Sequence, residues 1–297
     1  WKNYLLGVLY FLQQRGFQVS GFNAVFGGNL PVGAGLSSSA AVECGLAFAL
    51  NTIFGFAISR KDIALLCQQA EHHFPGVLCG IMDQYANMIG VKDHVLLLDC
   101  NNVTHEVLPF YSDEYEILLI NSKVHHALED GAYNKRRSQC EEGMAVLKSK
   151  LENVQTFRDI STVQLQKHKH LLDEVVHKRC SYVVAEIERT KQAAELLKKH
   201  HMGLFGELMF ETHAGLKDLY DVSCTELDFL VEKAKQHAGI AGARLMGGGF
   251  GGCTINLVKK GMAEKIVADI LPAYKNKFGF DAEHCIVHPA DGTYKMD

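Results

Sequence analysis

The sequence has 297 residues, enough for about two domains at roughly 150 residues each. It contains 30 basic and 34 acidic residues, a formal net charge of −4, and this argues against a nucleic-acid binder because no overall positive field attracts a polyanion. Hydrophobic residues make up 47% and charged residues 22%, which is typical of a globular protein and excludes a disordered or collagen-like chain.

The nine cysteines are scattered and include no C-x-x-C pair, so neither a disulfide framework nor a zinc ribbon is indicated. We expect free thiols in a cytoplasmic protein. The least polar stretch, residues 44–59, is shorter than the roughly 20 residues of a membrane span, so we expect a buried helix and no membrane partner. No secretory signal is visible over residues 1–16, although the chain begins at Trp rather than Met.

The first third of the chain predicts a mixture of helices and strands. Residues 1–14 place apolar side chains at three- and four-residue spacings, which predicts an amphipathic helix. Residues 17–26 alternate in polarity and predict a strand. A glycine-rich stretch, residues 27–35, then leads through consecutive serines into a long apolar helix over residues 40–54.

Further elements follow in the same mixed order. Ser59 is the expected N-cap of a helix over residues 60–72, with Asp62 in its first turn, where the helix dipole favours an anion. The remaining predicted elements are β-rich runs at 95–100, 104–109 and 115–121, a largely helical stretch over 133–237, a strand at 253–258, a helix at 263–277 and a strand at 285–287.

This order of elements predicts an α+β protein with two domains. We place the boundary between about residues 113 and 131 because the helical stretch begins there, as expected for two segments of different pattern. The expected domains are residues 1–120, with mixed helices and strands, and residues 121–297, which are helix-rich.

The sharpest local feature is the segment PVGAGLSSSAA, residues 31–41. Its glycines let the backbone turn N–H groups inward, and its serines fall where the long helix begins. Free amides and the positive end of the helix dipole then converge on one point, a geometry that holds phosphate. A plain glycine turn with an N-cap is the alternative, and a Walker A motif occurs nowhere in the chain.

A second glycine cluster lies near the C-terminus. Gly247, Gly249 and Gly252 fit the spacing G-x-G-x-x-G of a dinucleotide fingerprint. They precede a predicted strand, however, whereas that fingerprint must open a helix. We therefore interpret the cluster as backbone that closely approaches either a ligand or another main chain.

Two acidic residues are candidates for chemistry. Asp83 lies among apolar neighbours and is either a helix cap or a general base placed against a substrate hydroxyl. Glu71 ends an amphipathic helix, where a carboxylate opposes the dipole, so a cation such as magnesium would compensate for it. The 15 histidines show no recognisable zinc-binding spacing.

Together these segments resemble the galactokinases, a branch of the family of small-molecule kinases that includes homoserine, mevalonate and phosphomevalonate kinases. The serine-tipped loop and the cluster MGGGFGGC are shared across that family. The segments that point to the galactokinase branch are GIMDQ (80–84), GAYNKRRSQC (131–140) and YDVSCTELDFLV (220–231). The resemblance extends over the whole chain and implies a two-domain kinase fold with the active site in the cleft between the domains.

The resemblance implies transfer of the γ-phosphate from MgATP to the anomeric hydroxyl of D-galactose. Asp83 would be the base at that hydroxyl, Tyr133 would contact the sugar, and residues 247–252 would shape the floor of the nucleotide site. Ser39 and Glu71 would hold magnesium. The ATP phosphates would be bound by Gly33, Ala34, Gly35, Leu36, Ser37, Ser38 and Ser39. These roles suit phosphoryl transfer, which needs chiefly in-line positioning and neutralisation of charge.

One departure from the family pattern concerns the sugar site. The family's N-terminal motif contains an arginine that would pair with Asp83 and a Glu-His-x-Asp segment that would bind the sugar hydroxyls, and neither occurs in this sequence. A base without its cation has a weaker reason to stay ionised and oriented. We therefore expect the 297-residue chain alone to bind galactose poorly and to turn over little or nothing.

Two alternatives stay open. One is a non-enzymatic sensor that binds sugar and ATP and regulates through a protein partner, although the intact serines and Ala40 of the phosphate loop favour an enzyme. The other is a kinase for a related acceptor, such as N-acetylgalactosamine, arabinose or galacturonate. In either case the expected partners are small molecules, galactose and ATP above all, with no nucleic acid, and the expected state is a monomer.

Overall fold

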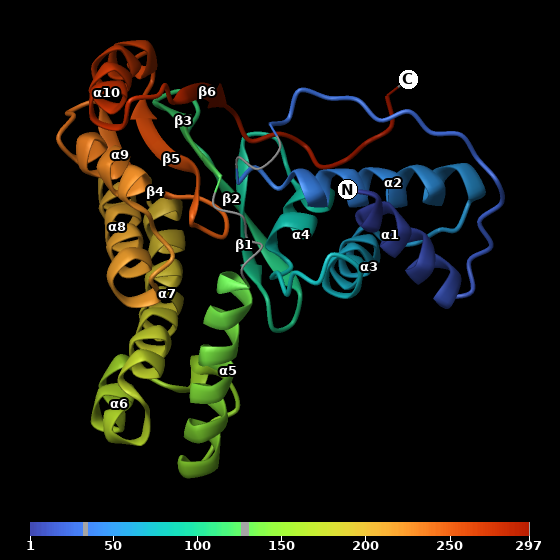
Figure 1. Cartoon of the computed structure of the whole chain (residues 1–297), viewed down its shortest axis with the longest axis horizontal. Helices are drawn as coiled ribbons and strands as arrows, with labels where there is room; N and C mark the ends of the chain where they lie inside the picture. The colour runs from blue at the N-terminus through green and yellow to red at the C-terminus, as the bar shows by residue number, and fades with distance from the viewer. Residues whose placement is uncertain (32–34, 126–130, 297) are drawn as a thin grey trace. The chain divides into compact units, whose positions relative to one another are not determined.

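The computed structural model of the chain describes residues 1–31, 35–125 and 131–296 (Figure 1). The chain divides into two compact units. Unit 1 comprises Trp1–Phe110 together with the C-terminal segment His288–Asp297, and unit 2 comprises Tyr111–Val287. The chain therefore leaves unit 1 after residue 110 and returns to it for its last residues.

This division differs from the expected boundary at residue 120 in two respects. It falls earlier because strand β3 (Tyr115–His125) is an inner strand of the unit 2 sheet, so the residues leading into β3 belong with that sheet. The C-terminal segment joins unit 1 because its backbone bonds to the end of helix α4 (Met82–Ile89), where Gly292 N donates to Gly90 O at 2.8 Å. Sequence pattern contains no signal for such a return.

Unit 1 is a cluster of helices with a small antiparallel sheet. Its core is formed by apolar faces of four helices, and Gly7 allows the first and third of them to approach, because a Cβ there would lie 2.8 Å from Ala70 Cβ. The elements are α1 (Lys2–Gln14), α2 (Ser38–Phe54), α3 (Arg60–His73), α4, β1 (His94–Asp99) and β2 (Thr104–Pro109).

The predicted strand over residues 17–26 is wrong. These residues belong to no helix or strand, and in the described part of the chain no strand pairs with them. Alternating polarity favours extended backbone, but a strand also needs a partner to accept and donate its main-chain hydrogen bonds. Most of this segment is exposed, and Val25 fully so.

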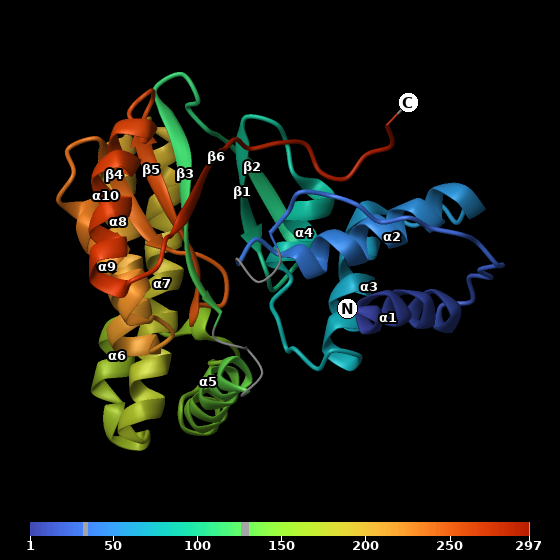
Figure 2. The same ribbon diagram turned by 45° about the horizontal axis from the view of Figure 1, so that its top comes forward.

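Unit 2 is built on a four-stranded antiparallel sheet in the order β4-β5-β3-β6. The central pairing sets Ile117 of β3 opposite Leu257 of β5, and Leu119 opposite Cys285 of β6. One buried cluster joins apolar side chains of β3, β4 and β5 to those of the helices α8 (Met202–Gly215), α9 (Thr225–Lys235) and α10 (Ala263–Phe278). Figure 2 shows these three helices beside the sheet. The other strands are β4 (Ile240–Leu245), β5 (Gly251–Lys259) and β6 (Glu283–Val287).

The helices of unit 2 occupy most of the stretch that the sequence predicts to be helical. Helices α5 and α7 pack together through a second buried cluster that includes Leu147 and Cys180. The helices are α5 (Ala132–Lys150), α6 (Thr162–Lys167), α7 (Glu174–Lys198), α8 (Met202–Gly215), α9 (Thr225–Lys235) and α10 (Ala263–Phe278), with short 3-10 turns at Phe157–Asp159 and Lys169–Leu171 and a π-helical turn at Leu216–Tyr220.

Several local predictions are confirmed. Ser59 caps α3, because its hydroxyl accepts the backbone N–H of Asp62 at 3.1 Å. The second glycine cluster leads into β5 and not into a helix, as its sequence context indicates. Within the described residues no helix is both long enough and apolar enough to cross a lipid bilayer.

Candidate active site

The serine-tipped loop ends in a helix N-terminus that has no side-chain cap among the described residues. Ser37, the N-cap of α2, adopts a left-handed φ of +53° and makes no capping hydrogen bond, while Ala41 N donates to Ser37 O at 3.0 Å. Because the first amides of a helix have no acceptor within it, the amides at the start of α2 point their N–H groups and the positive dipole end away from the helix. This geometry suits an anion.

The backbone of the loop is held in conformations that glycine favours. Gly35 has φ +73°, and the left-handed Ser37 costs roughly 1–2 kcal/mol relative to a helical conformation. Such strain persists only where surrounding structure fixes it. Leu36, Ser38 and Ser39 complete the described part of the predicted phosphate loop, and Gly33 and Ala34 lie outside the described residues.

Glu71 lies against this helix end. Its carboxylate is only 6% exposed, and it accepts hydrogen bonds from the Ser39 side chain and from Gln84 Nε2, the latter at 2.7 Å. Burial raises the pKa of Glu71, and hydrogen bonds from Ser39, Cys79 and Gln84 oppose that rise. The structure thus brings together Ser39 and Glu71, the two residues expected to hold magnesium.

Asp83 is close enough to Glu71 for its charge to raise the pKa of that carboxyl further. It is half-buried in the first turn of α4, whose N-cap is Ile81, so Asp83 is not the helix cap. In the described part of the chain no hydrogen bond engages its carboxylate. The cap interpretation of Asp83 is therefore excluded, and a carboxylate with open acceptor positions lies near the phosphate loop.

The loop between α3 and α4 is anchored where it precedes Asp83. The carbonyl oxygen of Cys79 accepts hydrogen bonds from His72 Nε2 at 2.8 Å and from Gln68 Nε2 at 3.2 Å, both on α3. At the other end of α4, Arg60 donates to Met88 O at 2.7 Å. Helix α4 is thus held to α3 both just before its start and at its C-terminal end. Asp83, in the first turn of α4, is therefore positioned by these two helices.

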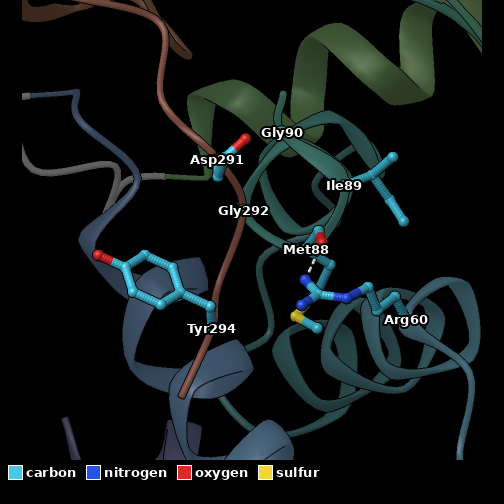
Figure 3. A pocket seen from close by; sticks show the side chains of 7 residues that line it. All are labelled: Arg60, Met88, Ile89, Gly90, Asp291, Gly292 and Tyr294. Carbon is cyan, nitrogen blue, oxygen red and sulfur yellow. Dashed lines mark hydrogen bonds between the residues drawn. The ribbon is translucent and has the colours of Figure 1, made fainter. Parts of the chain in front are cut away.

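A pocket of about 460 Å³ opens at the C-terminal end of α4, away from Asp83 (Figure 3). It lies where the C-terminal segment is tied to that helix end, with Lys92 N donating to Asp291 Oδ1 at 2.8 Å and Thr293 N to Asn87 O at 2.7 Å. None of the predicted site residues lines it. The lining residues are Arg60, Met88, Ile89, Gly90, Asp291, Gly292 and Tyr294.

Sequence reasoning missed two members of the unit 1 site. Glu43 is fully buried, and the side chains of Gln84 and Glu71 lie beside its carboxyl group. Burial and then the nearby charge of Glu71 raise the pKa of Glu43 to about 9, so this carboxyl holds a proton at neutral pH. Gln84 is also fully buried, and its Oε1 has no hydrogen-bond partner among the residues that the structure describes.

A signal for Glu43 was present in the sequence. It follows Ser39 by four residues on α2, and residues four apart share a helix face. The Ser39 hydroxyl, the Glu71 carboxylate and the Gln84 amide oxygen are hard donors of the kind that magnesium prefers, whereas the protonated Glu43 carboxyl is not. These donors fit a magnesium ion, although no cluster of three or more His, Cys, Asp or Glu side chains is gathered for a metal within the residues described.

Unit 2 contains the remaining predicted residues. Tyr133 is half-buried in the first turn of α5, after the left-handed Gly131. Residues 247–252, hereafter the glycine loop, follow β4 and include the first two residues of β5, and Met246 N donates to Cys253 O across the base of the loop at 3.0 Å. Glycine is required at two positions because a Cβ on Gly249 would lie 2.1 Å from Val222 O, and one on Gly251 would lie 2.3 Å from Val124 O. The expected close approach to another main chain is confirmed.

Comparison with known proteins identifies the family. Residues 3–91 match the model described as GHMP kinases N terminal domain, and residues 193–277 match GHMP kinases C terminal. A solved mevalonate kinase of L. major shares the fold at a TM-score of 0.58 and 17% identity, over 98% of this chain and 78% of that one. The chain thus has the fold and the domain matches of a GHMP-type small-molecule kinase.

Relatives with higher sequence identity identify the branch of this family. Galactokinase from Thermotoga neapolitana is 40% identical over 296 residues, covering 100% of this chain and 82% of the relative, and that of Fusobacterium nucleatum is 39% identical over 298 residues, covering 100% and 77%. The crystal structure of Lactococcus lactis galactokinase complexed with galactose matches with a TM-score of 0.96 at 32% identity, covering 100% of this chain and 76% of that one. The chain belongs to the galactokinase family.

Proposed function

We propose that the protein is an ATP-dependent galactokinase that converts D-galactose and ATP into galactose 1-phosphate and ADP. The observation that supports this most is the convergence of Ser39, Glu71 and Asp83 beside an uncapped helix N-terminus, in a chain whose relatives are named galactokinases. A triphosphate needs amides and a positive dipole end, and an acceptor hydroxyl needs a carboxylate near the transferred phosphoryl group.

In this proposal the start of α2 binds the phosphates of ATP. The amides of the first helical turn and the residues from Gly33 to Ser39 donate to phosphate oxygens, and the dipole of α2 offsets their charge. The glycine loop forms the floor of the nucleotide site, because its glycines allow the backbone to approach closely. A loop of this kind needs no lysine, since amides supply the donors.

Ser39 and Glu71 are the residues that would hold Mg²⁺. When bound, the ion neutralises charge on the phosphate oxygens. Magnesium usually retains several waters and takes one or two carboxylates plus phosphate oxygens, so the hydroxyl of Ser39 and the carboxylate of Glu71 are an adequate protein contribution. Gln84 holds the Glu71 carboxylate in place through the 2.7 Å hydrogen bond.

Asp83 is the proposed base. Its carboxylate accepts the proton of the C1 hydroxyl as the sugar oxygen bonds to the γ-phosphorus, and the bond from that phosphorus to the β,γ-bridging oxygen breaks to release ADP. Tyr133 contacts the sugar. The protein is expected to act in the cytoplasm, where MgATP is abundant, and as a monomer.

The experiment is a coupled assay of ADP release by the protein expressed from its full reading frame, with galactose as acceptor. We expect galactose-dependent release, and the product should show by ³¹P NMR a phosphate on the anomeric carbon. Equal or faster release with N-acetylgalactosamine, arabinose or galacturonate would move the assignment to a related sugar kinase. Binding of galactose and ATP without ADP release would indicate the sensor alternative.

A further inference from the structure

Two arginines from different helices converge on the residue that ends the π-helical turn of unit 2. Arg136 comes from α5 and Arg179 from α7, and their side chains are only 11% and 7% exposed. Both guanidinium groups contact Asp221 Oδ2, Arg136 at 2.7 Å and Arg179 at 2.9 Å. Shielded arginines that share one carboxylate form a fixed geometry, because each guanidinium is planar and donates in fixed directions.

The same arginines also bind main-chain carbonyls. Arg136 donates to Tyr220 O at 2.9 Å and to Asp221 O at 2.8 Å, while Arg179 donates to Leu219 O at 2.5 Å. These carbonyls lie at the end of the π-helical turn, where Asp221 adopts a left-handed φ of +58°. Carbonyls at a helix end lack intrahelical donors, so the arginines satisfy them and fix this turn. π-Helical turns often occur at functional sites.

The residue after this turn supports the glycine loop. Val222 is 2% exposed, and its carbonyl oxygen accepts the N–H of Phe250 at 2.7 Å. Phe250 has a left-handed φ of +60°, a strained conformation for a residue with a side chain, and it persists only where neighbours hold it. The Arg136 guanidinium lies 5.9 Å from the centre of the Phe250 ring. Arg136 therefore contacts the glycine loop directly, at Phe250, and also binds the π-helical turn that precedes Val222.

Arg136 is also close in sequence to the proposed sugar contact. It follows Tyr133 by three residues on α5, and residues three apart lie on one face of a helix. Arg136 thus connects helix α5 to Asp221, and the next residue, Val222, binds the glycine loop.

We infer that Arg136, acting through Asp221, is a positioning residue that holds the glycine loop and the first turn of α5 in one fixed arrangement. The inference rests on the proposed function, in which the loop serves the nucleotide and Tyr133 the sugar. In-line transfer depends on the relative placement of the two reactants, so a loosened loop lowers the rate constant for turnover even where both substrates still bind.

The test is the substitution Arg136→Lys, which keeps the charge and removes the planar fork. In the ligand-free protein we expect amide hydrogen exchange of peptides spanning residues 247–252 to accelerate about tenfold, as for a segment that opens locally, with little change in α10. In the active enzyme we expect kcat for galactose phosphorylation to fall by about tenfold or more, while the two KM values change by less than about threefold.

Arg189→Lys is the matched control. Arg189 lies on α7, has a side chain 16% exposed and pairs with Glu186 and Glu211, so it is a shielded, doubly paired arginine whose carboxylate partners lie outside the glycine loop. Loop exchange and kcat should remain near wild type in this variant. Equal acceleration in both variants would show that Arg136 only stabilises the unit, and the inference would be overturned.

A second variant covers the case in which Arg136→Lys does not fold. Asp221→Asn removes the shared carboxylate charge but leaves the main-chain bonds of Arg136, and it should accelerate loop exchange to a smaller extent. Because the two changes share the contact between Arg136 and Asp221, the double variant should accelerate exchange by less than the product of the two single effects, and fully multiplied effects would contradict the inference. Exchange is read without substrate, so a wild type that lacks galactokinase activity overturns the proposed function and not this inference.

Discussion

The two units shift the pKa of a shielded carboxyl in opposite directions. In unit 1, Glu43 is fully buried beside the charged Glu71, and burial together with that charge raises its pKa to about 9. In unit 2, burial also opposes ionisation of Asp228, but its contacts with His213, Ser223 and Lys217 outweigh burial and hold its pKa at about 2. One group keeps its proton, and the other keeps its charge.

The difference follows from the neighbours of each group. Asp228 has Ser223 Oγ at 2.6 Å, Lys217 Nζ at 3.1 Å and His213 Nε2 at 3.3 Å, which together stabilise the anion. Glu43 instead has Glu71 as its charged neighbour. Satisfied carboxylates stabilise a fold, whereas carboxyls crowded together cost stability and occur where chemistry requires them. The contrast thus separates a structural cluster from the proposed active site.

The largest expected effect concerns Glu43. Because its folded pKa of about 9 lies above the value of 4.5 for a free carboxyl, folding binds a proton, and the stability this provides is lost as the pH rises toward 9. The variant Glu43→Gln cannot titrate. Relative to wild type, it should gain up to about 1.4 kcal/mol in free energy of unfolding per pH unit between about pH 5 and pH 8.

Urea unfolding at several pH values, followed by far-UV circular dichroism, measures that difference. A difference between Glu43→Gln and wild type that does not change with pH would contradict the raised pKa of Glu43 and break the contrast between the units.

Asp228→Asn is the matched change in unit 2 and should have the opposite sign. The folded pKa of Asp228 lies below the free value of 3.8, so its stabilisation is present above about pH 4 and is lost as the pH falls toward 2. We expect the variant to lose about 1–2 kcal/mol of unfolding free energy at neutral pH, a figure reduced for partial exposure of the group. Acid titration of unfolding checks it, and equal losses at pH 7 and pH 2.5 would argue against a titrating Asp228.

A smaller effect is expected for Ser223→Ala. This change removes the hydroxyl that donates to Asp228 Oδ1 at 2.6 Å and leaves the other two neighbours in place. It should raise the pKa of Asp228 and lower the unfolding free energy by about 1 kcal/mol, the size of a typical intramolecular hydrogen bond. Carboxyl ¹³C NMR titration reports that pKa, and an unchanged value would remove Ser223 from the cluster.

The sequence predicted elements best where local chemistry decides them. Ser59 and Asp62 specify the start of α3, and the polarity of residues 263–277 specifies α10. The strand predicted over residues 17–26 was wrong because a strand depends on a partner strand, which no local pattern reveals. The sequence did not predict the return of the C-terminal segment to α4 for a related reason, since this return depends on backbone contacts such as that of Gly292 with Gly90.

The candidate site was predictable to the extent that a motif marks it. Ser39, Glu71 and Asp83 were singled out from a glycine–serine loop, a helix end and a family resemblance, and all three gather in unit 1. Glu43 and Gln84 were missed because burial is a property of packing and not of a short pattern. Likewise, the role of Arg136 depends on Asp221, 85 residues further along the chain.

The most direct test of the proposed function is the turnover of Asp83→Ala against wild type, in protein expressed from the full reading frame. We predict that galactose-dependent ADP release falls by about 10²–10⁴-fold, as for loss of a positioned base, while ATP affinity measured by calorimetry stays within about twofold. Release at the wild-type rate by the alanine variant would contradict the assignment of Asp83 as the base.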